Sequence, residues 1–193
     1  MNTIDTIKAR RSVRKYKTDP VPEELLKDLL EAAAWAPSAV NRQPWYFVAI
    51  SKPEQLHLLG QIMEEVSLKV EPNLQKTFQN HPEVVSETTA FIRRLGGAPA
   101  CVLAFMQHDN YAPEVADAMT LSVGAAIENM LLRATELGLG SCWMTAPVEV
   151  SCGDRIRDLF APEKGRLVSM IVLGYPAQEP QAPRRKEERY VIL

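Results

Sequence analysis

The sequence predicts one globular domain in which helices and strands are mixed, and three observations lead to this fold class. The chain has 193 residues, of which 46% are hydrophobic and 24% charged, which is enough for one packed core. Short apolar runs of strand length alternate with longer segments of helical periodicity. The longest apolar runs, residues 98–106 and 167–172, are far shorter than the roughly 18–20 residues that cross a bilayer. We therefore expect no membrane partner and, because no apolar leader follows Met1, a cytoplasmic location.

The first elements are separated by proline. Residues 4–10 predict a short helix. Residues 21–24 (VPEE) predict the start of a second helix, because proline and acidic residues suit a first turn, and Pro37 ends it. Residues 36–44 carry several helix breakers and predict a loop, which leads into an aromatic and β-branched strand at residues 45–50.

The middle of the chain combines a broken helical pattern with an apolar strand. Residues 53–94 predict two or three helices with a mobile middle, because the helical pattern is interrupted at Gly60, Pro72 and Pro82. Residues 100–106 are entirely apolar and predict a strand that is covered on both faces.

Residues 115–137 predict the longest helix. It is apolar nearly all round, so we expect it to be buried on every side, and a subunit interface is the natural place for it. Residues 141–144 and 167–173 predict two more strands, with a helix at residues 150–160 between them. The proline-rich segment 176–193 has an apolar end and predicts an arm that docks on another surface, such as a neighbouring subunit.

The net charge of −2 hides an uneven distribution. The first seventeen residues carry +5 and residues 184–189 carry +2, so the rest of the chain carries −9. Positive charge confined to the two ends of an acidic protein favours a small anionic ligand. We therefore expect no nucleic-acid partner.

The cysteines and histidines do not predict a metal site or a reactive thiol. Cys101, Cys142 and Cys152 form no CxxC pair, and the three histidines have no HExxH spacing. We expect no metal, and Cys101 is interpreted as a small core residue inside a strand.

Residues 10–14 (RRSVR) are the first candidate binding motif. Three guanidinium groups and a hydroxyl suit a phosphate, because arginine presents a planar fork of donors to phosphate oxygens. The alternative interpretation is a solvated basic terminus, which is the commoner meaning of a run of charges.

Two further segments offer binding groups on loops. Residues 36–45 (APSAVNRQPW) place polar side chains just before a strand, although an ordinary helix-to-strand connection has the same form. Residues 138–147 (GLGSCWMTAP) have glycines at a strand entry, which would let the backbone approach a flat ligand. The alternative there is a helix C-cap followed by a turn.

Taken in order, these segments resemble the FMN-dependent nitroreductase family. The matching pieces are RRSxR at 10–14, APSxxNxQPW at 36–45, GAAIENM at 124–130, GLGSCW at 138–143 and GYP at 174–176. Each motif alone is weak, but the ordered set is specific and covers nearly the whole chain.

The resemblance implies an α+β fold with a central, mostly antiparallel sheet wrapped by helices. It also implies an intertwined homodimer with two FMN sites at the interface. The chain would form one FMN-binding domain over residues 1–193. Residues 54–94 would be a helical insert that roofs the acceptor site, and residues 176–193 would be a C-terminal arm.

The activity implied by the resemblance is that of an NAD(P)H-dependent flavin oxidoreductase of the nitroreductase type. Hydride would pass from NADH or NADPH to flavin N5 and then to a nitroaromatic, quinone or activated enone. We expect no dedicated catalytic residue, because the flavin carries the chemistry and water can supply the proton.

The family pattern also assigns residues to the FMN phosphate. Arg10, Ser12 and Arg14 would hold the phosphate and the ribityl chain, and Arg11 would contribute through its backbone. A cation of the arm would return to the phosphate, and Glu187 stands where the family usually has proline, so its identity stays open. The candidates are Arg184, Arg185 and Lys186.

A loop of the partner subunit would reach the flavin. Its contributing residues would be Pro37, Ser38, Ala39 and Asn41. Ala39 stands where relatives often have serine or glycine, so only its backbone could contribute, and Gln43 is a weaker candidate. A backbone N–H near Thr145 or Ala146 would face flavin N5. The polar contact to the pyrimidine edge, expected after the first strand, is not placed.

Two alternatives stay open. The protein could be a specialised member of the same fold, such as a dehalogenase, an enoate reductase or a flavin-cleaving enzyme, and the insert at residues 54–94 would decide which. It could instead be a non-catalytic flavin carrier. Trp35 and Trp45 are expected in the core or at an interface, whereas Trp143 either flanks the flavin or packs elsewhere.

Overall fold

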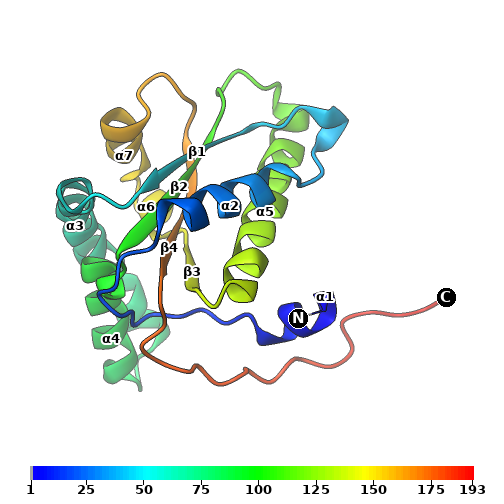
Figure 1. Ribbon diagram of the computed structural model, residues 1–193. Helices are drawn as coiled ribbons and strands as arrows, with labels where there is room; N and C mark the ends of the chain where they lie inside the picture. Colours follow the sequence, from blue (N-terminus) through cyan, green and yellow to red (C-terminus); the bar gives the residue numbers. More distant parts are fainter. Residues whose placement is uncertain (1) are drawn as a thin grey trace.

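An antiparallel sheet forms the centre of the structure, with its strands in the order β1-β2-β4-β3 (Figure 1). The computed structural model describes residues 2–193. Its strands are β1 (Trp45–Ile50), β2 (Ala100–Met106), β3 (Gly140–Met144) and β4 (Leu167–Gly174). Each neighbouring pair runs antiparallel. The expected α+β class with an antiparallel central sheet is confirmed.

Helices cover both faces of this sheet (Figure 1). They are α1 (Thr3–Ala9), α2 (Glu23–Ala34), α3 (Pro53–Thr77), α4 (Pro82–Arg94), α5 (Pro113–Glu136), α6 (Ala146–Glu149) and α7 (Gly153–Phe160). Two 3-10 turns each lie between a helix and the next strand: η1 (Ala39–Asn41) precedes β1, and η2 (Leu95–Gly97) precedes β2. One face of the sheet carries α3, α4 and α7, and the other carries α2 and α5.

Strand β2 connects the two cores because its side chains alternate between the faces. Cys101, Leu103 and Phe105 belong to the cluster under α3 and α4. Ala100 and Val102, with the remaining even-numbered residues, belong to the cluster under α2 and α5. All of β2 is buried, which confirms the prediction that both its faces are covered.

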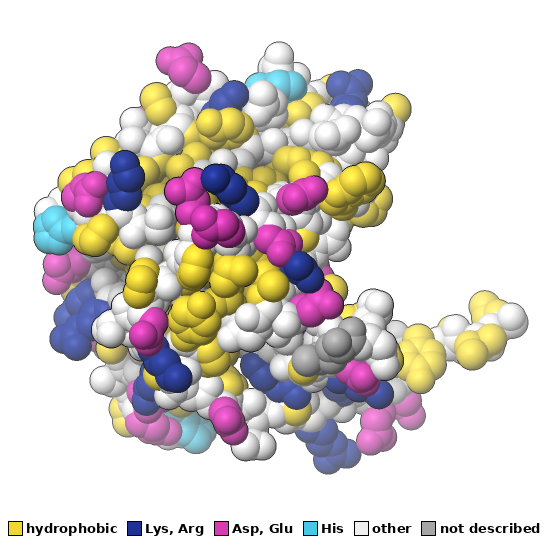
Figure 2. Space-filling model, viewed as in Figure 1, with side chains coloured by type: hydrophobic (Ala, Val, Ile, Leu, Met, Phe, Trp, Pro, Cys, Tyr) yellow, Lys and Arg dark blue, Asp and Glu magenta, His cyan; other side chains and the backbone are white. Residues whose placement is uncertain are grey.

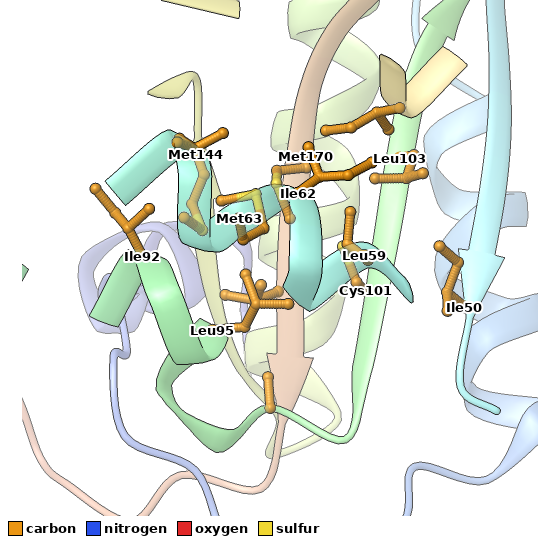
Figure 3. Close-up of a cluster of buried hydrophobic side chains, with 14 of the residues drawn as sticks. Ile50, Leu59, Ile62, Met63, Ile92, Leu95, Cys101, Leu103, Met144 and Met170 are labelled. Carbon is orange, nitrogen blue, oxygen red and sulfur yellow. The ribbon is translucent and has the colours of Figure 1, made fainter. Parts of the chain in front are cut away.

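The core under α3 is built mainly from long aliphatic and thioether side chains. Figure 3 shows Leu59, Ile62 and Met63 of α3 directed toward Leu103 of β2 and Met170 of β4. These five side chains are at most 5% exposed. Their burial fixes the position of the α3–α4 helical pair over the sheet.

The predicted interruptions at Gly60 and Pro72 are wrong, because α3 runs through both residues. Pro72 lies on the exposed side of the helix, so its ring meets solvent rather than the core. The buried stripe of α3 continues from Leu59 to Val70, and burial of several such side chains outweighs the roughly 3 kcal/mol that an interior proline costs. The predicted break at Pro82 is confirmed, since α4 begins there.

The helix predicted at residues 150–160 is shorter than expected. Only α7, which begins at Gly153, lies within this segment, because the short helix α6 ends before it, at Glu149. Ser151 between them has φ of 57°, a left-handed conformation that cannot continue an α-helix. Because α6 is separate from α7, Thr145 and Ala146 lie at the start of a short helix.

Helix α5 is not buried on every side in this chain. Leu121 on its open face is 74% exposed, and Trp35, at the end of α2, is 82% exposed. Within residues 2–193, α5 alone is long and apolar enough to pass a compositional test for a membrane span. Its inner side chains pack against the sheet and α2, as in the core helix of a globular protein.

Gly96 provides a test of how the N-terminal segment is held. It has φ of 63°, and a Cβ at this position would collide with the carbonyl oxygen of Arg14. We expect Gly96→Ala to lower the free energy of unfolding by about 2 kcal/mol or more. The matched control is Gly60→Ala in α3, where no atom lies within 4 Å of the new Cβ. It should raise stability by roughly 0.5–1 kcal/mol. Urea denaturation measures the free energy of unfolding of both variants. Equal changes in the two variants would contradict the close contact between Gly96 and Arg14.

Candidate functional site

The first and third sequence motifs lie side by side. Ser12 forms a parallel bridge with Ser141 of β3, and the Val13 N–H donates to the Ser141 carbonyl oxygen at 2.9 Å. A Cβ added at Gly140 would lie 2.9 Å from the Cβ of Val13, so only glycine permits this close approach. Residues 10–17, which we call the basic segment, therefore run along the free edge of β3.

A cavity of about 530 Å³ opens beside this contact, and we call it the β3 cavity. Four parts of the chain line it: Arg14 of the basic segment, residues 142–146 at the end of β3, residues 149–150 at the end of α6, and side chains from the facing surfaces of α3 and α4. The predicted residues Arg14, Thr145 and Ala146 thus share one cavity, and part of the 54–94 insert covers it. The roof is formed by residues such as Leu74 and Phe91.

Arg10, Arg11 and Arg14 make different contacts. The Nε of Arg10 lies 3.4 Å from Oε1 of Glu128 on α5, and the Arg10 side chain is 24% exposed. Arg11 folds back on its own backbone, donating to the carbonyl oxygens of Lys8 and Arg10 at 2.6 Å. The guanidinium carbon of Arg14 lies 5.9 Å from the centroid of the Phe91 ring, so this cation packs over an aromatic face.

Cys142, the buried cysteine of β3, has an unreactive thiol. Burial raises the pKa of the Cys142 thiol, while the nearby charges of Arg14 and Arg10 act in the opposite direction. The thiol is therefore neutral at physiological pH and is no nucleophile. Burial also raises the pKa of Cys101, which is fully buried in β2, as expected of a core residue.

The second motif forms a strained, outward-facing loop. Val40, Asn41 and Gln43 have φ values of 53°, 51° and 47°, although β-branched residues rarely adopt this conformation. The Ala39 N–H donates to Oγ of Ser122 at 3.1 Å, which ties η1 to α5.

The structure does not bring this loop to the β3 cavity within one chain. None of Pro37, Ser38, Ala39 and Asn41 is among the residues that line the cavity. Strain held in an exposed loop is typical of segments that bind something. The expectation that the loop acts on a second copy therefore stays a prediction.

The C-terminal arm is anchored only where it begins. The Lys17 N–H donates to the Tyr175 carbonyl oxygen at 2.9 Å, and Tyr16 bridges to Pro176. The Ala177 N–H also donates to the Lys15 carbonyl oxygen at 2.9 Å. From residue 181 onward the arm is exposed, and its apolar end projects from the surface (Figures 1 and 2). Arg184 and Arg185 are exposed and do not line the β3 cavity.

Four polar residues of the cavity wall were not predicted from the sequence: Lys69, Asn73, Thr88 and Glu149. Two of them, Lys69 and Asn73, come from α3. They are four apart on α3 and share one side of that helix. The signal was present in the sequence, but the predicted break at Pro72 separated Asn73 from Lys69. The Lys69 Nζ lies 2.8 Å from Oε1 of Glu65 and 3.6 Å from Sγ of Cys152.

Trp143 also lines the β3 cavity and is 38% exposed. Its ring edge lies 3.7 Å from where a Cβ of Gly124 on α5 would stand. The side chain therefore bridges the cavity and α5 rather than packing in the core.

A comparison with protein families matches residues 7–175 to the model of the nitroreductase family. A Methanothermobacter thermautotrophicus protein, provisionally named NADH dehydrogenase/NAD(P)H nitroreductase, is 31% identical over 93% of this chain and 80% of its own length. Rat iodotyrosine deiodinase 1 is 28% identical over 95% of this chain and 65% of its own length.

Solved structures of flavoproteins and nitroreductases also resemble this chain. A BluB-like flavoprotein from Clostridium difficile superposes with a TM-score of 0.76 and 29% identity, covering 100% of this chain and 99% of its own. A nitroreductase with bound FMN from Bacteroides fragilis superposes with a TM-score of 0.76 and 26% identity, covering both chains completely.

Proposed function

The chain belongs to the nitroreductase family, and from this premise we propose that it is an FMN-dependent NAD(P)H oxidoreductase. The observation that carries the proposal is the β3 cavity, which gathers Arg14, Thr145 and Ala146 beneath the α3–α4 pair. The Bacteroides fragilis neighbour was crystallised with FMN. The name of the Methanothermobacter relative supports NADH or NADPH as the hydride donor.

The residues around the β3 cavity fit the chemistry of FMN. A phosphate requires several cationic donors, and Arg10, Ser12 and Arg14 lie in one segment held against β3. Gly140 lets the Val13 side chain pack directly against the backbone of β3, which holds this segment beside the cavity. When bound, FMN supplies hydride transfer between the nicotinamide and an acceptor.

The wall of the cavity positions polar groups for the ring. Ala146 is the first residue of α6, so its backbone N–H has no intrahelical acceptor and is our candidate donor to flavin N5, with Thr145 beside it. Lys69 and Asn73 are our candidates for the polar contact to the pyrimidine edge. An ammonium there would stabilise negative charge on the reduced ring.

The α3–α4 pair sets which acceptors can enter. Its contribution to the cavity is largely apolar, with Val70, Leu74 and Phe91 on the wall, and this suits planar nitroaromatics, quinones or activated enones. Glu149 also lines the cavity, but its carboxylate accepts a hydrogen bond from the Thr145 hydroxyl. We assign no catalytic acid, and water supplies the proton.

A specialised reductive dehalogenase is the second candidate, because rat iodotyrosine deiodinase 1 is 28% identical over 95% of this chain. A non-catalytic flavin carrier is the third. The first two candidates pass electrons from the reduced flavin to different acceptors, and the carrier passes them to none. Turnover measurements with several acceptors therefore distinguish the three.

We expect the purified protein to be yellow, to bleach anaerobically on addition of NADH or NADPH, and to recover its colour with menadione or a nitrofuran. Stopped-flow absorbance near the flavin band measures both half-reactions across a panel that includes a halogenated tyrosine. One acceptor preferred by about a hundredfold or more would replace the generalist reductase with a specialist. A protein that stays yellow with both nicotinamides would support the carrier, and a colourless protein that oxidises neither donor would contradict the proposal.

Removal of the phosphate-binding cations should weaken FMN affinity. Each charge-assisted hydrogen bond contributes about 1.5–3 kcal/mol, so we expect Arg10→Gln or Arg14→Gln to raise the Kd for FMN by about ten- to a hundredfold. Titration of apoprotein by flavin fluorescence measures this effect. Lys17→Gln is the matched control, because Lys17 is an exposed cation outside the RRSVR motif of residues 10–14. Equal affinity in all three variants would remove these arginines from the site.

A second copy of the chain would complete the site in this proposal. The exposed side chains of Leu121 (74%) and Trp35 (82%) give α5 and its surroundings an apolar surface without cover. Val40, on the strained loop beside α5, is 89% exposed. We therefore infer a homodimer in which each loop at residues 37–41 and each arm reach the partner.

Mixed dimers test this exchange of residues. We combine a chain carrying Arg10→Gln and Arg14→Gln with a chain carrying Asn41→Trp, which places bulk at an exposed position of the loop. Each homodimer should bind FMN poorly at both sites, whereas the mixed dimer regains one intact site of its two. Flavin content of dimers purified through two different tags measures the result. No recovery in the mixed dimer would mean that the loop does not act on the partner.

A further inference from the structure

A second and larger cavity, of about 860 Å³, lies on the other side of the Arg14–Phe91 pair. We call it the α4 cavity, because α4 forms one of its walls. Arg14, Thr88 and Phe91 line both this cavity and the β3 cavity. One extended molecule can therefore occupy both cavities by passing the shared wall.

Positive charge converges on the α4 cavity from two distant parts of the sequence. Arg14 and Lys15 come from the basic segment, and Arg94 comes from the last turn of α4. Within residues 2–193 none of these three cations pairs with a carboxylate. Glu87 is the one acidic residue of the wall, so the cavity keeps an excess of positive charge.

Rigid backbone contacts hold these cations together. The Tyr16 N–H donates to the Gly96 carbonyl oxygen at 3.1 Å, and the Ala177 N–H donates to the Lys15 carbonyl oxygen at 2.9 Å. Gly96 has φ of 63° and touches the Arg14 backbone closely enough to exclude any Cβ. The end of α4 is thereby fixed beside the basic segment, which pre-organises the cavity for an anion.

The cavity also offers aromatic surface. Phe78, at the end of α3, is half-buried on its wall, whereas Phe91 is buried beneath Arg14. A purine base can pack against the open part of the Phe78 ring, and the nearby cations suit a phosphate. The combination matches an adenosine phosphate better than a simple inorganic anion.

We propose that the α4 cavity binds the adenosine 2′-phosphate end of NADPH, which gives the protein a preference for NADPH over NADH. The proposal rests on the proposed function, because it requires the nicotinamide end to lie in the β3 cavity. Both dinucleotides carry the pyrophosphate, but only NADPH adds a phosphomonoester with a charge of about −1.5 to −2 at pH 7. Lys15 and Arg94 are the residues that distinguish the two donors.

Steady-state kinetics with both donors test the preference. We expect kcat/KM for NADPH to exceed that for NADH by about tenfold or more, and Arg94→Gln or Lys15→Gln to lower this ratio by about tenfold. Arg93→Gln and Lys17→Gln are the matched controls, because neither residue lines either cavity. They should leave the ratio within about twofold of the wild type. A wild-type ratio near one, or a ratio that Arg94→Gln and Lys15→Gln leave unaltered, would overturn the proposal.

Direct binding separates this inference from the proposed function. Calorimetric titration of the FMN-loaded protein with 2′,5′-ADP and with 5′-AMP needs no turnover, and we expect 2′,5′-ADP to bind about tenfold more tightly or better. The difference should shrink in Arg94→Gln. Equal binding of the two ligands in a protein that is yellow and active would overturn the α4 cavity alone. If Arg94→Gln lowered the FMN content instead, the cations would serve the flavin phosphate, and the inference would fail.

Discussion

The pairing of an extended basic segment with the free edge of β3 is the interaction on which the rest of the structure depends. The N–H groups of Val13, Tyr16 and Lys17 donate to carbonyl oxygens of β3, η2 and Tyr175, respectively, at 2.9–3.1 Å. Each such hydrogen bond contributes only about 1 kcal/mol, but three along one segment fix its course. The cations of this segment are thereby held at the cavities: Arg14 lines both of them, and Lys15 lines the α4 cavity.

Arg14 and Phe91 form the partition between those cavities. The cation lies 5.9 Å over the ring centroid, a contact in which a guanidinium keeps its charge while packing against apolar surface. The same side chain therefore faces the proposed flavin on one side and the proposed adenosine phosphate on the other. Continuity of α3 supports this partition, because the buried stripe from Leu59 to Val70 holds the α3–α4 pair over the sheet.

A single copy of the chain leaves several features without a role. The loop at residues 38–43 is strained yet exposed, α5 presents an uncovered apolar face, and the arm ends in four exposed residues, Tyr190 to Leu193. The strained loop lowers the stability of a single chain. The exposed apolar surfaces of α5 and of the arm favour association with another molecule. A partner subunit would account for all three at once, which is why the proposed site is divided between two chains.

Sequence alone determined the features that depend on local pattern. The strands at residues 45–50 and 100–106 have the predicted bounds, because strand signals are read from adjacent residues, and the ordered motifs identified the family. Tertiary structure decided what depends on burial and convergence. It carried α3 through Gly60 and Pro72, since packing outweighed propensity. It also brought Lys69 and Arg94 to the walls of the cavities that Arg14 lines. Contacts between segments far apart in the chain cannot be read from any single position of the sequence.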